Sequence, residues 1–185
     1  MAAILGAPLE AVEAMCREAA EGQVLSPANL NAPDQTVVAG HAAAVRRLPP
    51  IAKAHGARRV VELPVSAPFH CALMRPAQDR LERDLATLPL REARFPVLPN
   101  VSAEPKGDAD TFRATLASQV TAPVRWVETV RRIAASGVTT LVEIGPGKVL
   151  TGLAKRIAPE LKLLNVEDPA SIEAAVTAIT TGGAA

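Results

Sequence analysis

Apolar residues along the first 65 positions alternate between the spacing of strands and the spacing of helices. Short apolar runs, stopped by glycine or turn residues, predict strands over residues 2–5, 24–30, 36–39 and 58–65. Apolar positions three and four residues apart predict helices over residues 8–22 and 41–55. Pro49 and Pro50 lie in the middle of the second helix, and we expect them to break or kink it. The order of elements, βαββαβ, is the split βαβ or ferredoxin-like pattern.

The second half of the chain has a different pattern, in which helices separate isolated strands. The helices are expected over residues 74–88, 111–120, 123–136, 148–157 and 171–180. The strands are expected over residues 95–101, 139–144 and 161–166, the first interrupted by two prolines and the second buried. Strands that alternate with helices indicate a parallel sheet covered by helices, so the fold class is α/β (α+β). The tail from Thr181 is expected to fray.

The composition is that of a globular protein, and it argues against partners such as nucleic acids and membranes. The chain has 185 residues, of which 49% are hydrophobic and 21% charged, with a net charge of +1. This balanced charge, together with only 2% aromatic residues, weighs against nucleic acid as a partner. No apolar run approaches the ~18 residues that a membrane span needs. The first residues lack the basic start of a signal peptide, so we expect a cytoplasmic protein without membrane partners.

His70 is the residue best placed for chemistry, because it follows a predicted strand, lies between Pro68 and Pro76, and opens a predicted helix. In open α/β sheets, functional side chains lie where the strands end and loops begin. This position favours the interpretation of His70 as a general base. A histidine that only caps the helix or fills space is equally compatible with the sequence. A base needs a nucleophile, and no serine lies in a Gly-x-Ser-x-Gly frame. Ser66 is not a credible partner because it lacks that frame. Cys71 is not one either, because adjacent residues on a helix point in different directions and Cys71 directly follows His70.

Other segments have a structural and a functional interpretation. The Gly-Pro-Gly-Lys turn at residues 145–148 lacks the P-loop and dinucleotide spacings, which favours an ordinary strand-to-helix turn over an anion site. The amides within residues 29–35 fit turn chemistry. The arginine pairs at 46–47 and 58–59 fit a solvated face or a patch for an acidic partner. Two cysteines are too few for a disulfide framework or a metal site, so we expect reduced thiols.

Five motifs, in order and at family-like spacing, make the chain resemble the C-terminal part of the malonyl-CoA:acyl carrier protein transacylases. It is similar also to the acyltransferase domains of polyketide synthases. The motifs lie at residues 1–6, 29–40, 63–74, 119–126 and 143–153. The resemblance implies a large α/β-hydrolase-like subdomain into which a ferredoxin-like one is inserted. We therefore expect residues 1–65 to form the ferredoxin-like small subdomain and residues 66–185 to form the C-terminal part of the large α/β acyltransferase subdomain.

The resemblance also implies what individual residues do. In the family, a serine in a Gly-His-Ser-Leu-Gly elbow attacks the malonyl thioester, and the histidine at the position of His70 takes its proton as general base. The backbone carbonyl at the position of Gln119 orients that histidine. Asn29, Asn31 and Phe69 are the expected substrate-binding residues, the last as a bulky neighbour that accompanies malonyl over branched extenders. No metal or cofactor is implied, and the substrates are malonyl-CoA and phosphopantetheinylated acyl carrier protein.

The chain departs from the family pattern at the nucleophile. In the family, the serine elbow and the arginine that binds the malonyl carboxylate precede the position that matches Met1. The expected function is malonyl transfer from coenzyme A to acyl carrier protein in fatty-acid biosynthesis, with this chain inactive alone. The alternatives are a non-catalytic carrier-protein-binding fragment and one half of a split acyltransferase that associates with a complementary N-terminal fragment.

Overall fold

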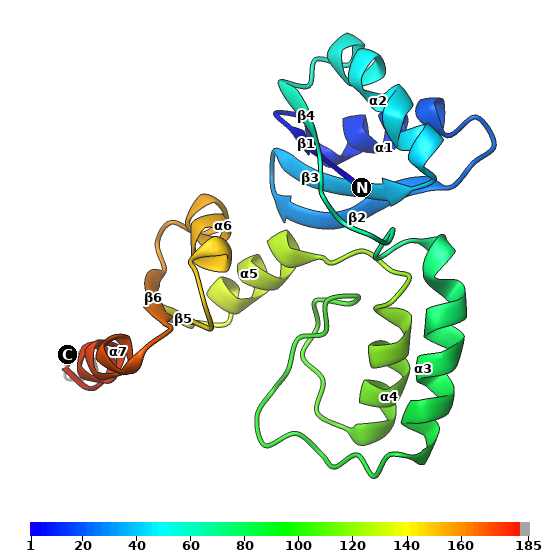
Figure 1. The fold of residues 1–185 in the computed structure, drawn as a ribbon. Helices are drawn as coiled ribbons and strands as arrows, with labels where there is room; N and C mark the ends of the chain where they lie inside the picture. Colours follow the sequence, from blue (N-terminus) through cyan, green and yellow to red (C-terminus); the bar gives the residue numbers. More distant parts are fainter. Residues whose placement is uncertain (182–185) are drawn as a thin grey trace. The chain divides into compact units, whose positions relative to one another are not determined.

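The structure is a computed structural model that describes residues 1–181, so the expected fraying of the tail lies almost wholly outside the described residues. The chain divides into two compact units, Met1–Thr129 and Val130–Ala185, with the boundary inside helix α5 (Trp126–Ala135). Each unit has its own sheet (Figure 1). The subdomain boundary expected near residue 65 stays a prediction.

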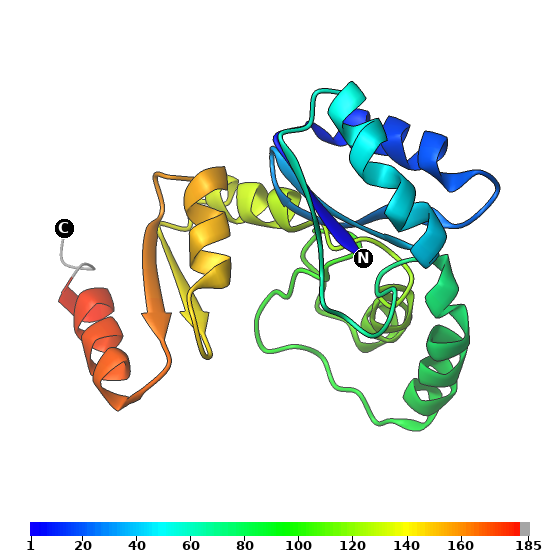
Figure 2. The same cartoon turned by 45° about the horizontal axis from the view of Figure 1, so that its top comes forward.

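The first unit begins with a four-stranded antiparallel sheet in the order β2-β3-β1-β4. Its strands are β1 (Ala2–Leu5), β2 (Leu25–Ala32), β3 (Gln35–Gly40) and β4 (Arg59–Glu62). Helices α1 (Leu9–Ala20) and α2 (Ala42–Ala54) lie together on one side of this sheet (Figure 2). The core between sheet and helices includes the buried side chains of Ile4, Val12, Met15, Val38 and Leu48. The observed order, βαββαβ, confirms the ferredoxin-like pattern expected from the sequence.

Helix α2 is continuous through Pro49 and Pro50, so the expected break is wrong. The side chains of this helix that pack inward are Ala44, Val45, Leu48 and Ala52. Both prolines are exposed. On the exposed side of a helix, a carbonyl that loses its N–H partner can be hydrated instead. The buried face therefore keeps its packing, which offsets the cost of the two prolines.

After the sheet, the first unit continues into two helices that pack side by side (Figure 1). The short 3-10 helix η1 (Ala72–Met74) leads into α3 (Arg75–Thr87), and α4 (Ala109–Ser118) follows after a long loop. The strand expected over residues 95–101 is reduced to one bridge between Val97 and Lys106. Two prolines in this segment lack the N–H donors that a strand ladder needs, which explains why no longer strand forms.

The second unit holds two parallel strands, β5 (Thr140–Ile144) and β6 (Lys162–Val166). Helices α6 (Val149–Ile157) and α7 (Pro169–Thr181) follow the two strands in turn. This alternation confirms the α/β class, but the expectation that the first of these strands is buried is wrong. Only Glu143 is buried in β5, and Ile144 is 81% exposed. A sheet of two strands has few neighbours to cover it, whereas parallel sheets are usually covered on both faces.

No helix within residues 1–181 combines the length and the apolar character that crossing a membrane requires. In the same residues, histidine, cysteine and acidic side chains form no group of three or more that would suit a metal ion. Cys16 and Cys71 are free and buried. Burial, with a smaller contribution from Glu13, raises the pKa of the Cys16 thiol to about 12, so this thiol stays protonated at neutral pH.

Candidate active site around His70

His70 occupies a tight turn between β4 and η1. Its backbone φ is +60°, in the left-handed region that most residues other than glycine avoid. The next residue, Cys71, anchors the turn, because its side chain is 1% exposed and its thiol donates to the carbonyl of Pro68 over 3.1 Å. Helix η1 begins at Ala72, so the expectation that His70 opens a helix is wrong. The left-handed backbone turns the chain before the helix starts, and strained positions of this kind collect at functional sites.

The ring of His70 is oriented by a backbone carbonyl. Its Nδ1 lies 2.9 Å from the carbonyl oxygen of Gln119. Because a carbonyl only accepts, Nδ1 must carry the proton of this hydrogen bond. In the neutral ring, Nε2 is then the unprotonated nitrogen, and its lone pair can accept a proton. The contact is the one that the family resemblance implies for these two residues, while their catalytic roles stay predictions.

Gln119 is itself held from two directions. It is the C-cap residue of α4, and its backbone N–H donates to the carbonyl of Thr115 over 3.0 Å. Its side-chain Oε1 accepts from the backbone N–H of Asn100 at 2.7 Å. The carbonyl of Asn100 in turn accepts from the N–H of Arg125 at 3.0 Å. The carbonyl that faces His70 therefore belongs to a braced segment rather than to a loose helix end.

His70 lines an open pocket of about 250 Å³. The other polar side chains of this pocket are Glu13, Ser26 and Thr121, which sequence reasoning missed. They come from α1, β2 and the segment after α4, and no spacing rule links these three positions in the sequence. Within residues 1–181 no hydrogen bond joins Ser26 to His70, so the structure gives this serine no activated hydroxyl.

The three predicted substrate-binding residues do not line this His70 pocket. Asn29 and Asn31 lie on β2, whose pairing with β3 is interrupted by two irregularities in this stretch. Bulges redirect side chains and are frequent next to active sites. Phe69 directly precedes His70 and is exposed. The structure thus joins His70 to Gln119, whereas substrate binding by the other three residues stays a prediction.

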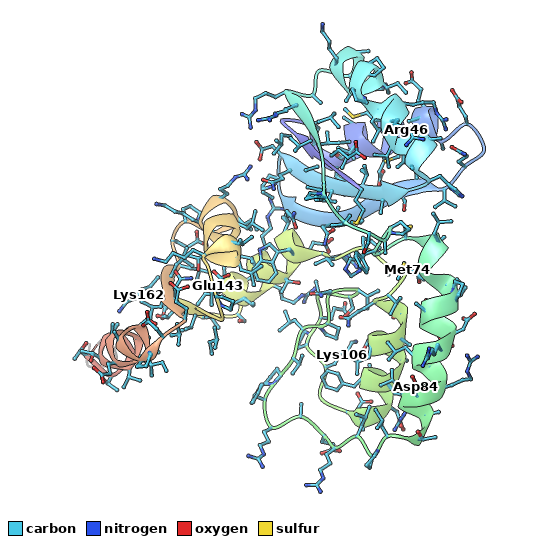
Figure 3. The ribbon with its side chains drawn as sticks, viewed as in Figure 1. Arg46, Met74, Asp84, Lys106, Glu143 and Lys162 are labelled. Carbon is cyan, nitrogen blue, oxygen red and sulfur yellow. The ribbon has the colours of Figure 1, made fainter. Side chains whose placement is uncertain are left out.

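One of the basic residues has a structural role. Arg47 donates to the carbonyls of Ala19 (2.8 Å) and Ala20 (2.9 Å), and so caps the C-terminal end of α1. It also lies 3.4 Å from the carboxylate of Glu21. Its neighbour Arg46 is exposed on α2 (Figure 3). The first arginine pair therefore contributes at most one free cation to a patch for an acidic partner.

The helix start that follows the turn at residues 145–148 binds a carboxylate of the chain itself. The carboxylate of Glu143, on β5, accepts from the backbone N–H groups of Leu150 (3.0 Å) and Thr151 (2.7 Å) at the start of α6 (Figure 3). It also accepts from the hydroxyl of Thr151 at 2.6 Å and from the side chain of Asn165 at 3.1 Å. Burial acts to raise the pKa of Glu143, but these hydrogen bonds outweigh it and the pKa lies below its usual value. A chain carboxylate thus takes the helix start that an external anion would use, in agreement with an ordinary strand-to-helix turn.

Replacing Glu143 by alanine is expected to destabilise the second unit by about 0.5–2 kcal/mol, since the N–H donors at the start of α6 lose the carboxylate that caps them. The loss should appear as faster amide hydrogen exchange in α6, compared with Glu160→Ala, an exposed control in the same unit. Because the folded-state pKa of Glu143 is lowered, its contribution is present above the unfolded-state pKa and is lost as pH falls through the folded-state pKa. Unchanged exchange of α6 in Glu143→Ala would show that the carboxylate does not stabilise this helix.

Comparison with known proteins identifies the class of proteins to which this chain is similar, the acyltransferases. The family described as the acyl transferase domain matches residues 2–173. The malonyl CoA-acyl carrier protein transacylase of Salmonella typhimurium is 47% identical over 177 residues, which are 96% of this chain and 57% of that protein. The structure of the malonyl CoA-acyl carrier protein transacylase from Coxiella burnetii matches with a TM-score of 0.92 at 41% identity, over 95% of this chain and 56% of that one. A type II PKS acyl-carrier protein in complex with its malonyl-transacylase also matches, with a TM-score of 0.92 at 44% identity over 95% of this chain and 57% of that chain.

The chain belongs to the acyl transferase domain family. Its α/β fold is shared with solved structures of malonyl CoA-acyl carrier protein transacylases, which confirms the expected fold class and family. The chain spans 57% of the length of the first curated relatives it matches.

Proposed function

We propose that this chain carries the histidine half of a site that transfers a malonyl group from coenzyme A to an acyl carrier protein. The observation that carries the proposal is the 2.9 Å hydrogen bond between Nδ1 of His70 and the carbonyl of Gln119. It fixes the ring so that Nε2 can act as a base, which is the arrangement of a histidine that activates a nucleophile. The names of the relatives supply the donor and the acceptor of the group.

In this proposal His70 moves one proton in each half of the reaction. Nε2 takes the proton of a serine hydroxyl while the serine oxygen bonds to the thioester carbonyl carbon. When the C–S bond breaks, the coenzyme A sulfur receives that proton from the ring. The thiol of the carrier's phosphopantetheine arm then gives its proton to Nε2, and its sulfur attacks the ester carbonyl carbon. The C–O bond breaks, the serine oxygen recovers the proton, and the Gln119 carbonyl stabilises the charged ring in both halves.

The serine is proposed to come from a complementary segment outside these 185 residues. None of the serines in this chain stands in a Gly-x-Ser-x-Gly frame, and the relatives are longer than this chain. The second unit supports the proposal, because its parallel sheet has only two strands and leaves apolar side chains exposed. Ile144, at the end of β5, is 81% exposed, and Val149, at the start of α6, is 70% exposed. Apolar side chains and open strand edges of this kind mark a surface that takes further protein. We propose that the serine-bearing segment is that protein.

The remaining parts of the site follow from the same reaction. Asn29, Asn31 and Phe69 are proposed to contact the acyl donor or the arm of the carrier. The two asparagines lie on β2, which also lines the His70 pocket, and Phe69 directly precedes His70. The proposed steps are acyl and proton transfers, which call for no metal or redox cofactor.

The proposal is tested by transfer in a reassembled enzyme. The chain is mixed with the part of the Salmonella typhimurium relative that it does not cover, and malonyl-CoA is added. We expect mass spectrometry to detect a malonyl ester on the serine of the added segment. The malonyl group should then move to carrier protein that bears the phosphopantetheine arm, and not to carrier without the arm. Binding of the carrier without ester formation would contradict the proposal and favour a non-catalytic carrier-binding fragment.

A further inference from the structure

Gln78 is a buried polar side chain that the proposed reaction does not use directly. It lies on α3 and is 6% exposed. Its Nε2 donates to Oε1 of Glu82 over 2.8 Å, and its Oε1 accepts from the hydroxyl of Thr121 at 2.5 Å. A buried amide is tolerated when both of its ends are bonded, and here both ends are. The three side chains form a relay that reaches from α3 to the segment after α4.

Chemistry fixes the direction of this relay. The Glu82 carboxylate only accepts, so the NH₂ group of Gln78 must face it and the amide oxygen must face Thr121. The hydroxyl of Thr121 therefore donates its single proton to Gln78. Thr121 lines the same pocket as His70. Because its single proton is bonded to Gln78, that proton is not available to another acceptor in the pocket.

The relay also holds in place the segment at residues 118–121, which contains Gln119. Thr121 follows Gln119 by two residues in the turn that ends α4, and its N–H donates to the carbonyl of Ser118 over 3.3 Å. His70 is joined to α3 through the turn that Cys71 anchors and through η1. Two hydrogen bonds therefore connect the same two segments, one from His70 to Gln119 and one from Thr121 to Gln78. The segment that contains His70 and α3 is therefore linked to the segment that contains Gln119 and Thr121 at two places.

We propose that Gln78 is a positioning residue for His70. Oriented by Glu82, its amide holds Thr121 so that the Gln119 carbonyl keeps the ring proton on Nδ1 and leaves Nε2 free. The consequence for malonyl transfer rests on the proposed function, whereas the position of the ring proton does not.

The ring proton is located by long-range ¹H–¹⁵N NMR of the histidine rings in the 185-residue chain, at a pH raised until the spectra show only neutral rings. His41 is an internal reference of the opposite kind, because its Nδ1 accepts from the backbone N–H of Val24 at 3.0 Å and its proton therefore lies on Nε2. The signals of His70 are assigned by their loss in His70→Asn. We expect the Nδ1–H form at His70 and the Nε2–H form at His41 in the same spectrum.

Two variants that break the relay are expected to change this result. Thr121→Val and Gln78→Met should each lower the ratio of Nδ1–H to Nε2–H at His70 by about fivefold, the factor that a neutral hydrogen bond contributes to an equilibrium. Thr121→Ser keeps the hydroxyl and should leave the ratio unchanged. Glu82→Ala, at an exposed position, lets the amide rotate, and we expect a smaller decrease in the same direction.

The His41 signal reports whether each variant has folded, and Glu82→Ala replaces Gln78→Met if the latter does not fold. An unchanged ratio at His70 in Thr121→Val and in the Gln78 or Glu82 variant would overturn the proposal. The same decrease in Thr121→Ser as in Thr121→Val would overturn it too, because shape rather than the hydroxyl would then matter. None of these spectra depends on malonyl transfer in the reassembled enzyme, so the two proposals can fail separately.

Discussion

The 185-residue chain alone is expected to transfer malonyl to acyl carrier protein no faster than the uncatalysed background. The physical reason is that His70 presents a base at Nε2 but the chain offers that base no serine in an elbow frame. Loss of the nucleophile from a unit that acts together typically costs about 10⁴-fold or more in turnover. The measurement is transfer of radiolabelled malonyl from malonyl-CoA to carrier protein bearing its arm.

The control for this first prediction is the same chain after addition of the serine-bearing segment, which we expect to restore transfer. A second control is the His70→Asn chain without the segment, which should equal the unaltered chain because neither is catalytic. Turnover by the chain alone within about tenfold of a full-length relative would contradict the prediction, since it would require a nucleophile inside these residues.

The ferredoxin-like part of the fold was open to prediction because its signals are local. Strand β1 matches the expected bounds, and the turn at Pro33 and Asp34 joins the two strands that the sequence predicts on either side. The continuity of α2 was not predictable from proline alone. Whether a proline breaks a helix depends on which side faces solvent, and that is decided by packing against the sheet.

In the second unit, the sequence predicted the secondary structure but not the burial. The strand expected over residues 139–144 forms over residues 140–144, but its burial depends on what covers the sheet, which a run of residues does not reveal. Glu143 illustrates a signal that sequence reasoning missed. An acidic residue just before a strand-to-helix turn can reach the free N–H groups at the helix start, and the two N–H···O distances of 3.0 and 2.7 Å show that it does.

Only one of the two residues of the candidate site could be predicted from the sequence pattern alone. His70 is marked by its position after a strand, but its partner is a backbone carbonyl 49 residues further along the chain. A backbone carbonyl leaves no trace in residue identity, so only the family resemblance pointed to Gln119. The contact between Gln78 and Thr121 spans 43 residues and joins residue types that are common on any surface. Such contacts follow from how α3 and α4 pack, and the sequence does not specify that packing by any local pattern.

Replacing His70 by asparagine in the reassembled enzyme is expected to lower kcat/KM for malonyl transfer by about 10³-fold or more, chiefly through kcat. Asparagine tolerates the left-handed backbone that His70 adopts at φ +60°. Its side-chain N–H groups can still donate to the carbonyl of Gln119, so the turn keeps its shape. The amide has no basic nitrogen at neutral pH, and the substitution therefore removes the base while sparing the fold. Stopped-flow or radiolabel assays of malonyl transfer measure the effect.

The matched control is His55→Asn, because His55 is an exposed histidine of the same unit whose Nε2 lies 2.9 Å from the carboxylate of Glu18. It should leave transfer unchanged, which separates loss of the base from loss of any imidazole. The residual rate of His70→Asn is expected to rise steadily with pH, because hydroxide then takes the serine proton that Nε2 no longer accepts. If His70→Asn kept more than about a tenth of the activity, the proton would have to leave by another group, and Nε2 of His70 would not be the base.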